Sequence, residues 1–431
     1  QEKYADEILR PNDLTRGTGF VGTTTRNKLN ELCLDTMALV SSSSTDQIAS
    51  LPVAVPPWPE RLSRIFVGSG GLWSFFLAIF LVFGVNLIFW SLIGVLRILS
   101  EKLAVLGRGF KPKTGAKSQD LKIKVADVAA LIPAHNEALV ITETLLSLSR
   151  LLKPENMFVI SDGSSDQTAQ IAKAYGAQVL ELKPGRGKAG ALAAGLAKFK
   201  IAQRYQAVLL VDADTRLKPD YLLKSLPFFN DPQIVAVAGY ATTIWQPKGL
   251  SWQQLLFITH RDRVYFLTQN LVKFGQTWKY TNVTAIVPGF ASIYRTTILD
   301  QIDINPPGLV IEDFNMTFEV HHKRLGKIAH HPSAIAYTQD PDNLKDYFQQ
   351  IKRWHLGFWQ TIKLHGVWSS AFWLALALTL FEVISGSLVF LLLPLWILAA
   401  VIPFNPWQPF LLTFLIGILL ADYLLTILTT D

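Results

Sequence analysis

Carboxylates recur along the middle of this chain, and several of them directly follow an apolar run. Asp212-Ala213-Asp214 follows the apolar run 207–211, and two carboxylates one residue apart can offer oxygens to one hard divalent cation, Mg²⁺ or Mn²⁺. Such a cation would also bind diphosphate oxygens and offset the charge of a departing nucleotide. We therefore predict a metal site at Asp212 and Asp214, although Asp-x-Asp alone is also a common turn.

Two further side chains on this stretch could contact a nucleotide. Asp162 ends a predicted strand, where it can accept hydrogen bonds from a base edge or a ribose; an Asx turn is the structural alternative. Lys188 stands at a predicted helix start, where backbone N–H groups also favour phosphate, and a flexible basic loop is the alternative. The Gly-x-Gly-x-x-Gly pattern at 185–190 is not a dinucleotide fingerprint, because Lys183 and Pro184 separate it from the preceding strand.

A second acidic pair, Glu312-Asp313, precedes a run with helical spacing at 314–325. A carboxylate close to a donor sugar could take a proton from an attacking acceptor hydroxyl, and Glu312 could raise the pKa of Asp313. An ordinary acid pair at a helix N-terminus is the alternative. His135 is interpreted as shaping the nucleotide pocket and not as a catalytic base.

The segment 343–368 is amphipathic, rich in aromatic residues, and lies directly before a long apolar stretch. Gln350, Arg353 and Trp354 fall on neighbouring turns of one helical face. Arg353 can hold a diphosphate through paired hydrogen bonds, and Trp354 can stack on a sugar ring. We interpret the segment as an interfacial helix with tryptophans at headgroup depth; anchoring alone explains the tryptophans, but less easily Gln350 with Arg353.

The chain is too apolar for an ordinary soluble enzyme, since 50% of its 431 residues are hydrophobic and only 17% are charged. The excess is concentrated in three stretches, at 72–96, 371–403 and 409–428. Each is long enough to span a bilayer, and Pro394 could divide the second. Buried helices of a soluble protein, the alternative, rarely exceed about 14 uncharged residues.

The formal net charge is +7, and basic residues gather directly after the first apolar stretch. They are Lys102, Arg108, Lys111, Lys113, Lys117, Lys122 and Lys124. By the positive-inside rule they place residue 101 onward in the cytoplasm of a plasma-membrane or inner-membrane protein. Beside membrane segments, anionic lipid is a simpler partner than nucleic acid. Cys33 is the sole cysteine, which excludes a disulfide within one chain.

Residues 125–340 alternate between strand-like and helix-like patterns. Strands are predicted at 125–132, 157–160, 178–182 and 207–211, and helices at 138–152, 165–175 and 189–200. This order predicts an α/β, doubly wound, Rossmann-like and largely parallel sheet. Ligands of such sheets bind beyond the carboxyl ends of the strands, where the acidic motifs stand.

The predicted organisation has five parts: a polar tail at 1–65, a transmembrane segment at 66–100, a cytosolic catalytic domain at 101–342, the interfacial helix at 343–368 and a transmembrane region at 369–431. Because the chain opens with Gln1 and stops directly after an apolar stretch, we expect it to be processed or truncated.

Together the motifs resemble those of the membrane-integrated, inverting glycosyltransferases with a GT-A domain, the group that holds the cellulose, chitin, hyaluronan and poly-N-acetylglucosamine synthases. The resemblance covers about residues 125–368. It rests on Pro133-Ala134-His135-Asn136-Glu137, Asp162-Gly163-Ser164, Gly187-Lys188-Ala189-Gly190-Ala191-Leu192, Asp212-Ala213-Asp214, Glu312-Asp313 and Gln350-x-x-Arg353-Trp354.

The resemblance also implies a role for each site residue. Asp313 would be the catalytic base, and Asp212 and Asp214 would hold the metal and the diphosphate. The residues implied to bind the nucleotide sugar are Glu137, Asp162, Lys188, Asp212 and Arg353. Those implied to bind the acceptor are Gly289, Glu312, Gln350 and Trp354, since 288–290 falls where the family has an acceptor-facing loop.

The expected function is metal-dependent transfer of a sugar from a UDP-sugar to a growing β-linked polysaccharide, by one in-line displacement at a membrane. Related enzymes that glycosylate membrane lipids share most of these motifs, so single addition to a lipid is the alternative. A non-catalytic membrane scaffold is a remote third. The expected partners are the UDP-sugar, a carbohydrate or lipid acceptor and membrane lipid; partner subunits stay open, and nucleic acid is not expected.

Overall fold

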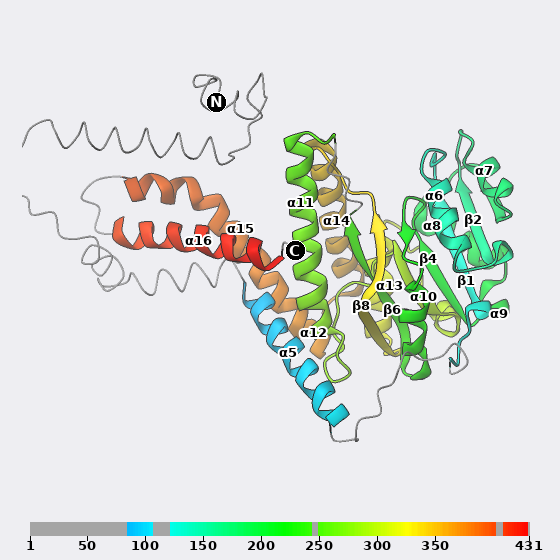
Figure 1. Cartoon of the computed structure of the whole chain (residues 1–431), viewed down its shortest axis with the longest axis horizontal. Coiled ribbons are helices and arrows are strands. Elements are labelled where there is room, and N and C mark those ends of the chain that lie inside the picture. Colours follow the sequence, from blue (N-terminus) through cyan, green and yellow to red (C-terminus); the bar gives the residue numbers. More distant parts are fainter. Residues whose placement is uncertain (1–83, 107–120, 244–248, 402–407, 430–431) are drawn as a thin grey trace, which may run out of the picture. The chain divides into compact units, whose positions relative to one another are not determined.

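The computed structural model describes residues 84–106, 121–243, 249–401 and 408–429 (Figure 1). The predicted tail at 1–65 and residues 66–83 of the predicted first transmembrane segment lie outside these residues.

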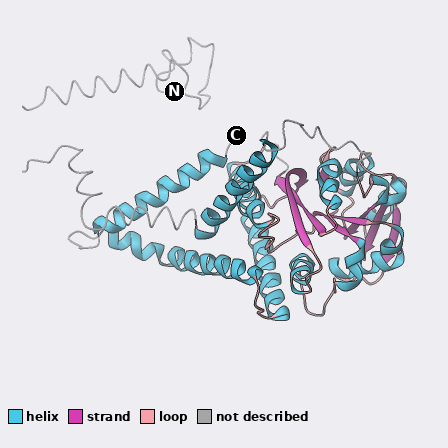
Figure 2. Cartoon of the chain, turned by 90° about the horizontal axis from the view of Figure 1, so that it is seen from below, coloured by secondary structure: helices cyan, strands magenta, loops and turns pink. Residues whose placement is uncertain are grey.

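One eight-stranded sheet organises the described α/β region, with the strand order β3-β2-β1-β4-β7-β6-β8-β5 (Figure 2). Its strands are β1 (Val128–Ala134), β2 (Met157–Asp162), β3 (Gln178–Leu182), β4 (Ala207–Val211), β5 (Arg216–Leu217), β6 (Ile234–Thr243), β7 (Ala291–Arg295) and β8 (Lys327–Thr338). The strands β1 to β4 are mutually parallel, whereas β7 runs antiparallel to both β4 and β6. The sheet is therefore mixed beyond β4.

The predicted doubly wound α/β core is confirmed in the part built by β1 to β4. The predicted strands at 178–182 and 207–211 have the bounds of β3 and β4. The predicted strand at 125–132 was misplaced: it begins at Val128, because 125–127 forms a short 3₁₀ helix, and it continues through Pro133 to Ala134. Pro133 has no N–H to donate to a neighbouring strand, but it stands next to the last residue of β1, where this loss is tolerated.

Alternate residues of the central strands face two different helical layers. On β1, Ala130 and Ile132 belong to the apolar cluster that contains residues of α6 (Ile141–Ser149). Leu131 belongs to the cluster on the other face, which contains residues of α8 (Gly187–Lys198). A fully apolar strand such as β1 is therefore explained by burial on both faces.

The remaining helices carry or support the predicted site. The shorter segments are η4 (Val125–Asp127), η5 (Pro154–Asn156), α7 (Thr168–Ala174), α9 (Ile201–Arg204), α10 (Tyr221–Ser225), η6 (Leu226–Asn230), α12 (Phe274–Gln276) and η8 (Thr296–Gln301). The longer ones are α11 (Trp252–Phe266), the π-helix η7 (Leu267–Lys273), α13 (Glu312–His322) and α14 (Leu344–His365). Helix α14 corresponds to the segment predicted as the interfacial helix.

Three further helices flank this region: α5 (Val85–Leu106), α15 (Ala371–Val401) and α16 (Gln408–Thr429). Within the described residues one stretch, Ala371–Leu395, is long and apolar enough to cross a membrane, and Phe410–Ala421 is a shorter apolar helix. Helix α15 runs through Pro394, which does not divide it. The other transmembrane segments stay predictions.

Candidate active site

Four of the predicted site residues, Glu137, Asp162, Asp212 and Asp214, lie at the carboxyl ends of β1, β2 and β4 or in the loops that follow them. Strands β2 and β4 flank β1 on opposite sides, and all three run parallel. In doubly wound sheets, loops that leave neighbouring strands in this way diverge, and ligands bind in the crevice expected between them. These loops begin at His135, Gly163 and Asp212.

The loop after β2 is held against the segment that leads into α8. Gly163 has a φ of 69°, and its N–H donates to Leu182 O at 2.9 Å. The N–H of Arg186 donates to Asp162 Oδ1 at 2.6 Å. A Cβ at Gly185 would stand 3.0 Å from Asp162 O, so this close approach favours glycine. Asp162 thus orients the start of α8 as well as facing the crevice.

The loop after β1 is tied to the end of β2, to the loop that follows β2 and to the first residue of α7. His135 Nδ1 lies 2.6 Å from Asp162 O, and the N–H of Asn136 donates to Ser164 Oγ at 3.1 Å. The N–H of Glu137 donates to Thr168 Oγ1 at 2.8 Å. His135 therefore fixes the end of β2, which agrees with a shaping role.

Lys188 joins three of the predicted motifs. Its Nζ lies 2.6 Å from Asp212 Oδ1 and 3.1 Å from Glu312 Oε1. Burial alone would lower the pKa of Lys188, but the carboxylates of Asp212 and Glu312 raise it above its ordinary value. Lys188 is therefore a fixed cation between the Asp-x-Asp turn and the second acidic pair.

Asp313 lies in the first turn of α13, opposite the loop that precedes β7. Its Oδ1 accepts from the N–H of Phe314 at 2.7 Å, and its Oδ2 accepts from the N–H of Gly289 at 3.3 Å. Burial and the neighbouring Glu312 raise the pKa of Asp313 to about 6, against the opposing effect of Lys188. The half-buried carboxylate is oriented by two N–H groups, and its raised pKa favours a role in proton transfer.

Gly289 is packed at the centre of this group. A Cβ there would stand 3.0 Å from Glu312 Oε1, 3.1 Å from Lys188 Nζ and 3.7 Å from Asp313 Cβ. The first two separations are shorter than ordinary carbon contacts, so a side chain would displace the polar groups around it. The sequence-predicted acceptor loop thus touches the second acidic pair directly.

We expect Gly289→Ala to lower the predicted sugar transfer by about tenfold, because a shift of a few tenths of an ångström at Glu312 and Lys188 misplaces groups expected to bind the acceptor and the donor. The thermal unfolding midpoint should change little. Steady-state kinetics and differential scanning fluorimetry of both proteins measure the two effects. Gly386→Ala on α15 is a matched control, since a Cβ there meets nothing within 4 Å. Wild-type rates in Gly289→Ala would contradict the packing argument.

The Asp-x-Asp turn collects negative charge beside Lys188. Burial, Asp212 and Glu137 raise the pKa of Asp214 to about 6, and burial followed by Asp212 raises the pKa of Glu137. A divalent cation would relieve this mutual repulsion, so the two aspartates fit a metal. Within the described residues, however, no three His, Cys, Asp or Glu side chains form a ready-made cation cage. Asp212 and Asp214 would therefore supply two ligands to the predicted metal, and diphosphate oxygens and water would supply the others.

Helix α14 presents the predicted Gln-Arg-Trp residues in two directions. Gln350 and Trp354 are partly buried, and both contact the guanidinium of Arg261 on α11. Arg353 is exposed on α14, and within the described residues no polar contact joins it to the other predicted site residues. The structure thus brings together Gln350 and Trp354 without Arg353.

Three residues of this group, Arg261, Tyr265 and Asp340, were not predicted. The Tyr265 hydroxyl donates to Asp340 Oδ1 at 2.8 Å, and Arg261 Nε lies 3.3 Å from the same oxygen. Their partners are 75 to 89 residues away in sequence, and no local pattern marks such a pairing. The burial of the Arg261 charge on α11 follows from the packing of α11 against α14 (Figure 1), which a single sequence does not show.

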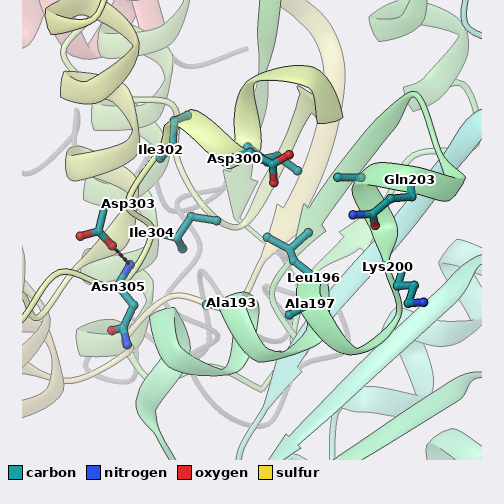
Figure 3. A pocket seen from close by; sticks show the side chains of 12 residues that line it. Ala193, Leu196, Ala197, Lys200, Gln203, Asp300, Ile302, Asp303, Ile304 and Asn305 are labelled. Atoms are coloured by element: carbon teal, nitrogen blue, oxygen red, sulfur yellow. Dashed lines mark hydrogen bonds between the residues drawn. The ribbon is translucent and has the colours of Figure 1, made fainter.

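A cavity of about 710 Å³ lies elsewhere, between α8, α9 and η8 (Figure 3). It is lined by Ala193, Leu196, Ala197, Lys200, Ala202, Gln203, Leu299, Asp300, Ile302, Asp303, Ile304 and Asn305. None of these is a predicted site residue. The carboxylates of the crevice, and not this cavity, are therefore the candidate active site.

Comparison with known proteins agrees with the motif analysis. Residues 129–302 match the family model described as glycosyl transferase family 2. The chain is 29% identical over 245 residues to the probable glycosyltransferase YdaM of Bacillus subtilis (strain 168), covering 53% of this chain and 54% of that protein. It is 25% identical to the poly-beta-1,6-N-acetyl-D-glucosamine synthase of Staphylococcus epidermidis over 56% of this chain and 58% of that protein.

The hyaluronan synthase of Streptococcus pyogenes is also similar, at 25% identity over 54% of this chain and 57% of that protein. The chain thus spans little more than half the length of these relatives. The predicted resemblance to family 2 glycosyltransferases is confirmed by these matches.

Proposed function

We propose that this chain, whose residues 129–302 match the model of glycosyl transferase family 2, moves a sugar from a UDP-sugar to a growing β-linked polysaccharide. The observation that carries the proposal is the convergence of Asp313, Gly289 and the ion pairs of Lys188 with Asp212 and Glu312. These groups would surround the anomeric carbon of the donor and its leaving diphosphate.

Transfer would be one in-line displacement in which Asp313 is the base. The acceptor hydroxyl oxygen bonds to the anomeric carbon while the bond from that carbon to the phosphate oxygen breaks. The electron pair leaves with UDP, and the hydroxyl proton passes to Asp313. Attack from the face opposite the diphosphate inverts the anomeric carbon. The N–H groups of Gly289 and Phe314 orient the carboxylate for this proton transfer.

Asp212 and Asp214 would hold Mg²⁺ or Mn²⁺, whose chemistry when bound is to offset charge on the diphosphate. Lys188, already fixed by Asp212, would add a second positive charge on the same side of the donor. Glu137 faces these carboxylates and would bind the donor through the same ion, and Asp162 would contact the nucleoside.

The acceptor would lie between α13 and α14. Trp354 would stack on its terminal sugar. Gln350 and Glu312 would bind hydroxyl groups of the acceptor. Helix α14 packs directly on this region, since a Cβ at Gly357 would stand 2.7 Å from Ile311, next to Glu312. Arg353 is exposed on α14 and would contact the diphosphate of a donor that extends toward this helix.

We further propose that the enzyme is an integral membrane protein with a cytoplasmic catalytic domain at 101–342. Support comes from the apolar stretch Ala371–Leu395 and from α14, whose outer surface exposes large apolar side chains. They are Leu344, Phe348, Leu356, Trp359 and Leu364. An amphipathic helix of this kind, close to an apolar helix, suits the headgroup region of a bilayer. The tail at 1–65 has no proposed role.

Transfer should fall as the pH is lowered through about 6, because the base must be ionised and the pKa of Asp313 is raised to about 6. The measurement is kcat/KM from about pH 5 to about pH 8, with a loss of about tenfold per pH unit on the acid side. A profile that is flat through pH 6, on protein shown to stay folded, would exclude a base with this pKa.

Product size tests the proposed acceptor. Full-length protein in nanodiscs is incubated with Mn²⁺ and a labelled UDP-sugar that it consumes, and the product is divided into polymer and organic-extractable fractions. Label of high molecular weight is the expected result. A single sugar on extractable lipid would replace the polysaccharide proposal by the lipid alternative, and the anomeric configuration of either product, read by NMR, tests inversion.

A further inference from the structure

Arg261 is the largest side chain that the described structure buries completely, and it is charged. It lies on α11 with a relative exposure of 2%. A buried guanidinium is costly unless charged and polar groups surround it, so its neighbours show why the chain holds it there. Those neighbours come from three different segments.

One neighbour neutralises the charge of Arg261. Its Nε lies 3.3 Å from Asp340 Oδ1, and both side chains are 2% exposed. The hydroxyl of Tyr265, one turn further along the same helical stretch, donates to that same oxygen at 2.8 Å. Asp340 is thus held in place from the helix that carries Arg261, just before α14 begins.

The other neighbours are the two partly buried members of the Gln-Arg-Trp motif. Arg261 Nη2 donates to Gln350 Oε1, and the guanidinium carbon lies 4.8 Å from the centre of the Trp354 ring. Gln350 and Trp354 are four residues apart, so they project from successive turns of α14 on the same side. One guanidinium therefore sets the orientation of both, by a directed hydrogen bond and by a cation–π contact.

A third aromatic side chain completes the arrangement. The Tyr347 ring centre lies 5.1 Å from the Arg261 guanidinium carbon, and the Tyr347 hydroxyl is 3.1 Å from His260 Nε2. Arg261 is thus enclosed by Tyr347, Gln350 and Trp354 along two turns of α14. The Trp354 ring packs against the guanidinium of Arg261, so it has little freedom to change rotamer while that guanidinium stays in place.

We propose that Arg261 is a positioning residue for the acceptor end of the site, which holds the Gln350 amide and the Trp354 ring in the orientation that receives an acceptor sugar. The inference rests on the proposed function, because the acceptor role of Gln350 and Trp354 belongs to it. Arg261 itself touches neither the donor nor the reacting atoms.

The test separates orientation from activity. Full-length protein in nanodiscs is labelled with 5-fluorotryptophan, and Trp354→Phe identifies the ¹⁹F signal of Trp354. Arg261→Gln should shift and broaden that signal while the other tryptophan signals stay in place. UDP affinity with Mn²⁺ should stay within about twofold, whereas transfer from UDP-N-acetylglucosamine or UDP-glucose should fall by about 10²-fold. Lys363→Gln, which removes an exposed charge from α14, should leave all readouts unchanged.

A second variant keeps the test decisive if Arg261→Gln leaves an unpaired charge and unfolds. Arg261→Met with Asp340→Asn removes both charges and keeps an oxygen for Tyr265, so the same readouts apply without an isolated buried carboxylate. An unchanged Trp354 signal in either folded variant would overturn the positioning role, whatever the activity. If wild-type protein cleaves no UDP-sugar, the proposed function fails, while the ¹⁹F signal still decides whether Arg261 orients Trp354.

Discussion

Replacing Asp313 with asparagine should reduce sugar transfer by about 10²–10⁴-fold, the range that a positioned general base contributes. The amide oxygen can still accept from the N–H of Phe314, which is the shorter of the two hydrogen bonds, whereas the longer one from the N–H of Gly289 is lost. The amide cannot take the proton of an acceptor hydroxyl. Because Asp313 is assigned to proton transfer and not to nucleotide binding, affinity for UDP should survive.

The variant is examined by single-turnover transfer and by calorimetric titration with UDP. Asp300→Asn is a suitable control, since this exposed carboxylate lines the separate cavity and is not part of the crevice. Retained turnover in Asp313→Asn would exclude Asp313 as the base. Parallel loss of UDP binding would instead mean that Asp313 supports the donor site.

Replacing Asp212 with alanine should remove metal-dependent binding of the nucleotide. The change takes away one of two adjacent carboxylates and one of the two acidic partners of Lys188. We expect the affinity for UDP in the presence of Mn²⁺ to fall by about 100-fold, or about 2.7 kcal/mol. Binding without metal should change less, because Lys188 keeps Glu312 as a partner at 3.1 Å.

Titration of Mn²⁺ into protein with and without UDP measures this difference. Glu143→Ala provides a matched control, since Glu143 is an exposed carboxylate whose 3.8 Å pair with Arg216 lies at the surface. Unchanged Mn²⁺ affinity in Asp212→Ala would refute the metal role. The proposed function would then need another source of charge for the leaving diphosphate, for which Lys188 is the nearest cation.

Local patterns were sufficient for the parallel half of the sheet and for its carboxyl-end loops. Strands β3 and β4 were predicted to the residue: β4 is a short apolar run that ends at Asp212, and β3 is a short run between Gly176 and Pro184. The limits of β1 were missed at both ends. A 3₁₀ turn and a strand-internal proline are decided by packing and by pairing with β2, which a single sequence does not show.

Pairings between distant segments were beyond the sequence. The insertion of β7 between β4 and β6 joins residues more than 50 positions apart. Lys188 was placed near phosphate by its helix start, but its contact with Glu312 depends on how α13 packs against the sheet. Arg261 gave no signal, since a charged residue in a helix is ordinarily exposed. Whether a side chain is buried depends on the assembled fold, so a local sequence pattern does not predict it.

The central claim is that this chain transfers sugar from a UDP-linked donor. The most direct test incubates full-length protein in nanodiscs with Mn²⁺ and separately labelled UDP-glucose, UDP-N-acetylglucosamine and UDP-galactose, and it follows both UDP release and label in the product. The account predicts that at least one donor gives equal amounts of released UDP and transferred sugar, and that Asp313→Asn loses both. Absence of UDP release and of labelled product with every UDP-sugar, in protein that stays folded, would contradict it.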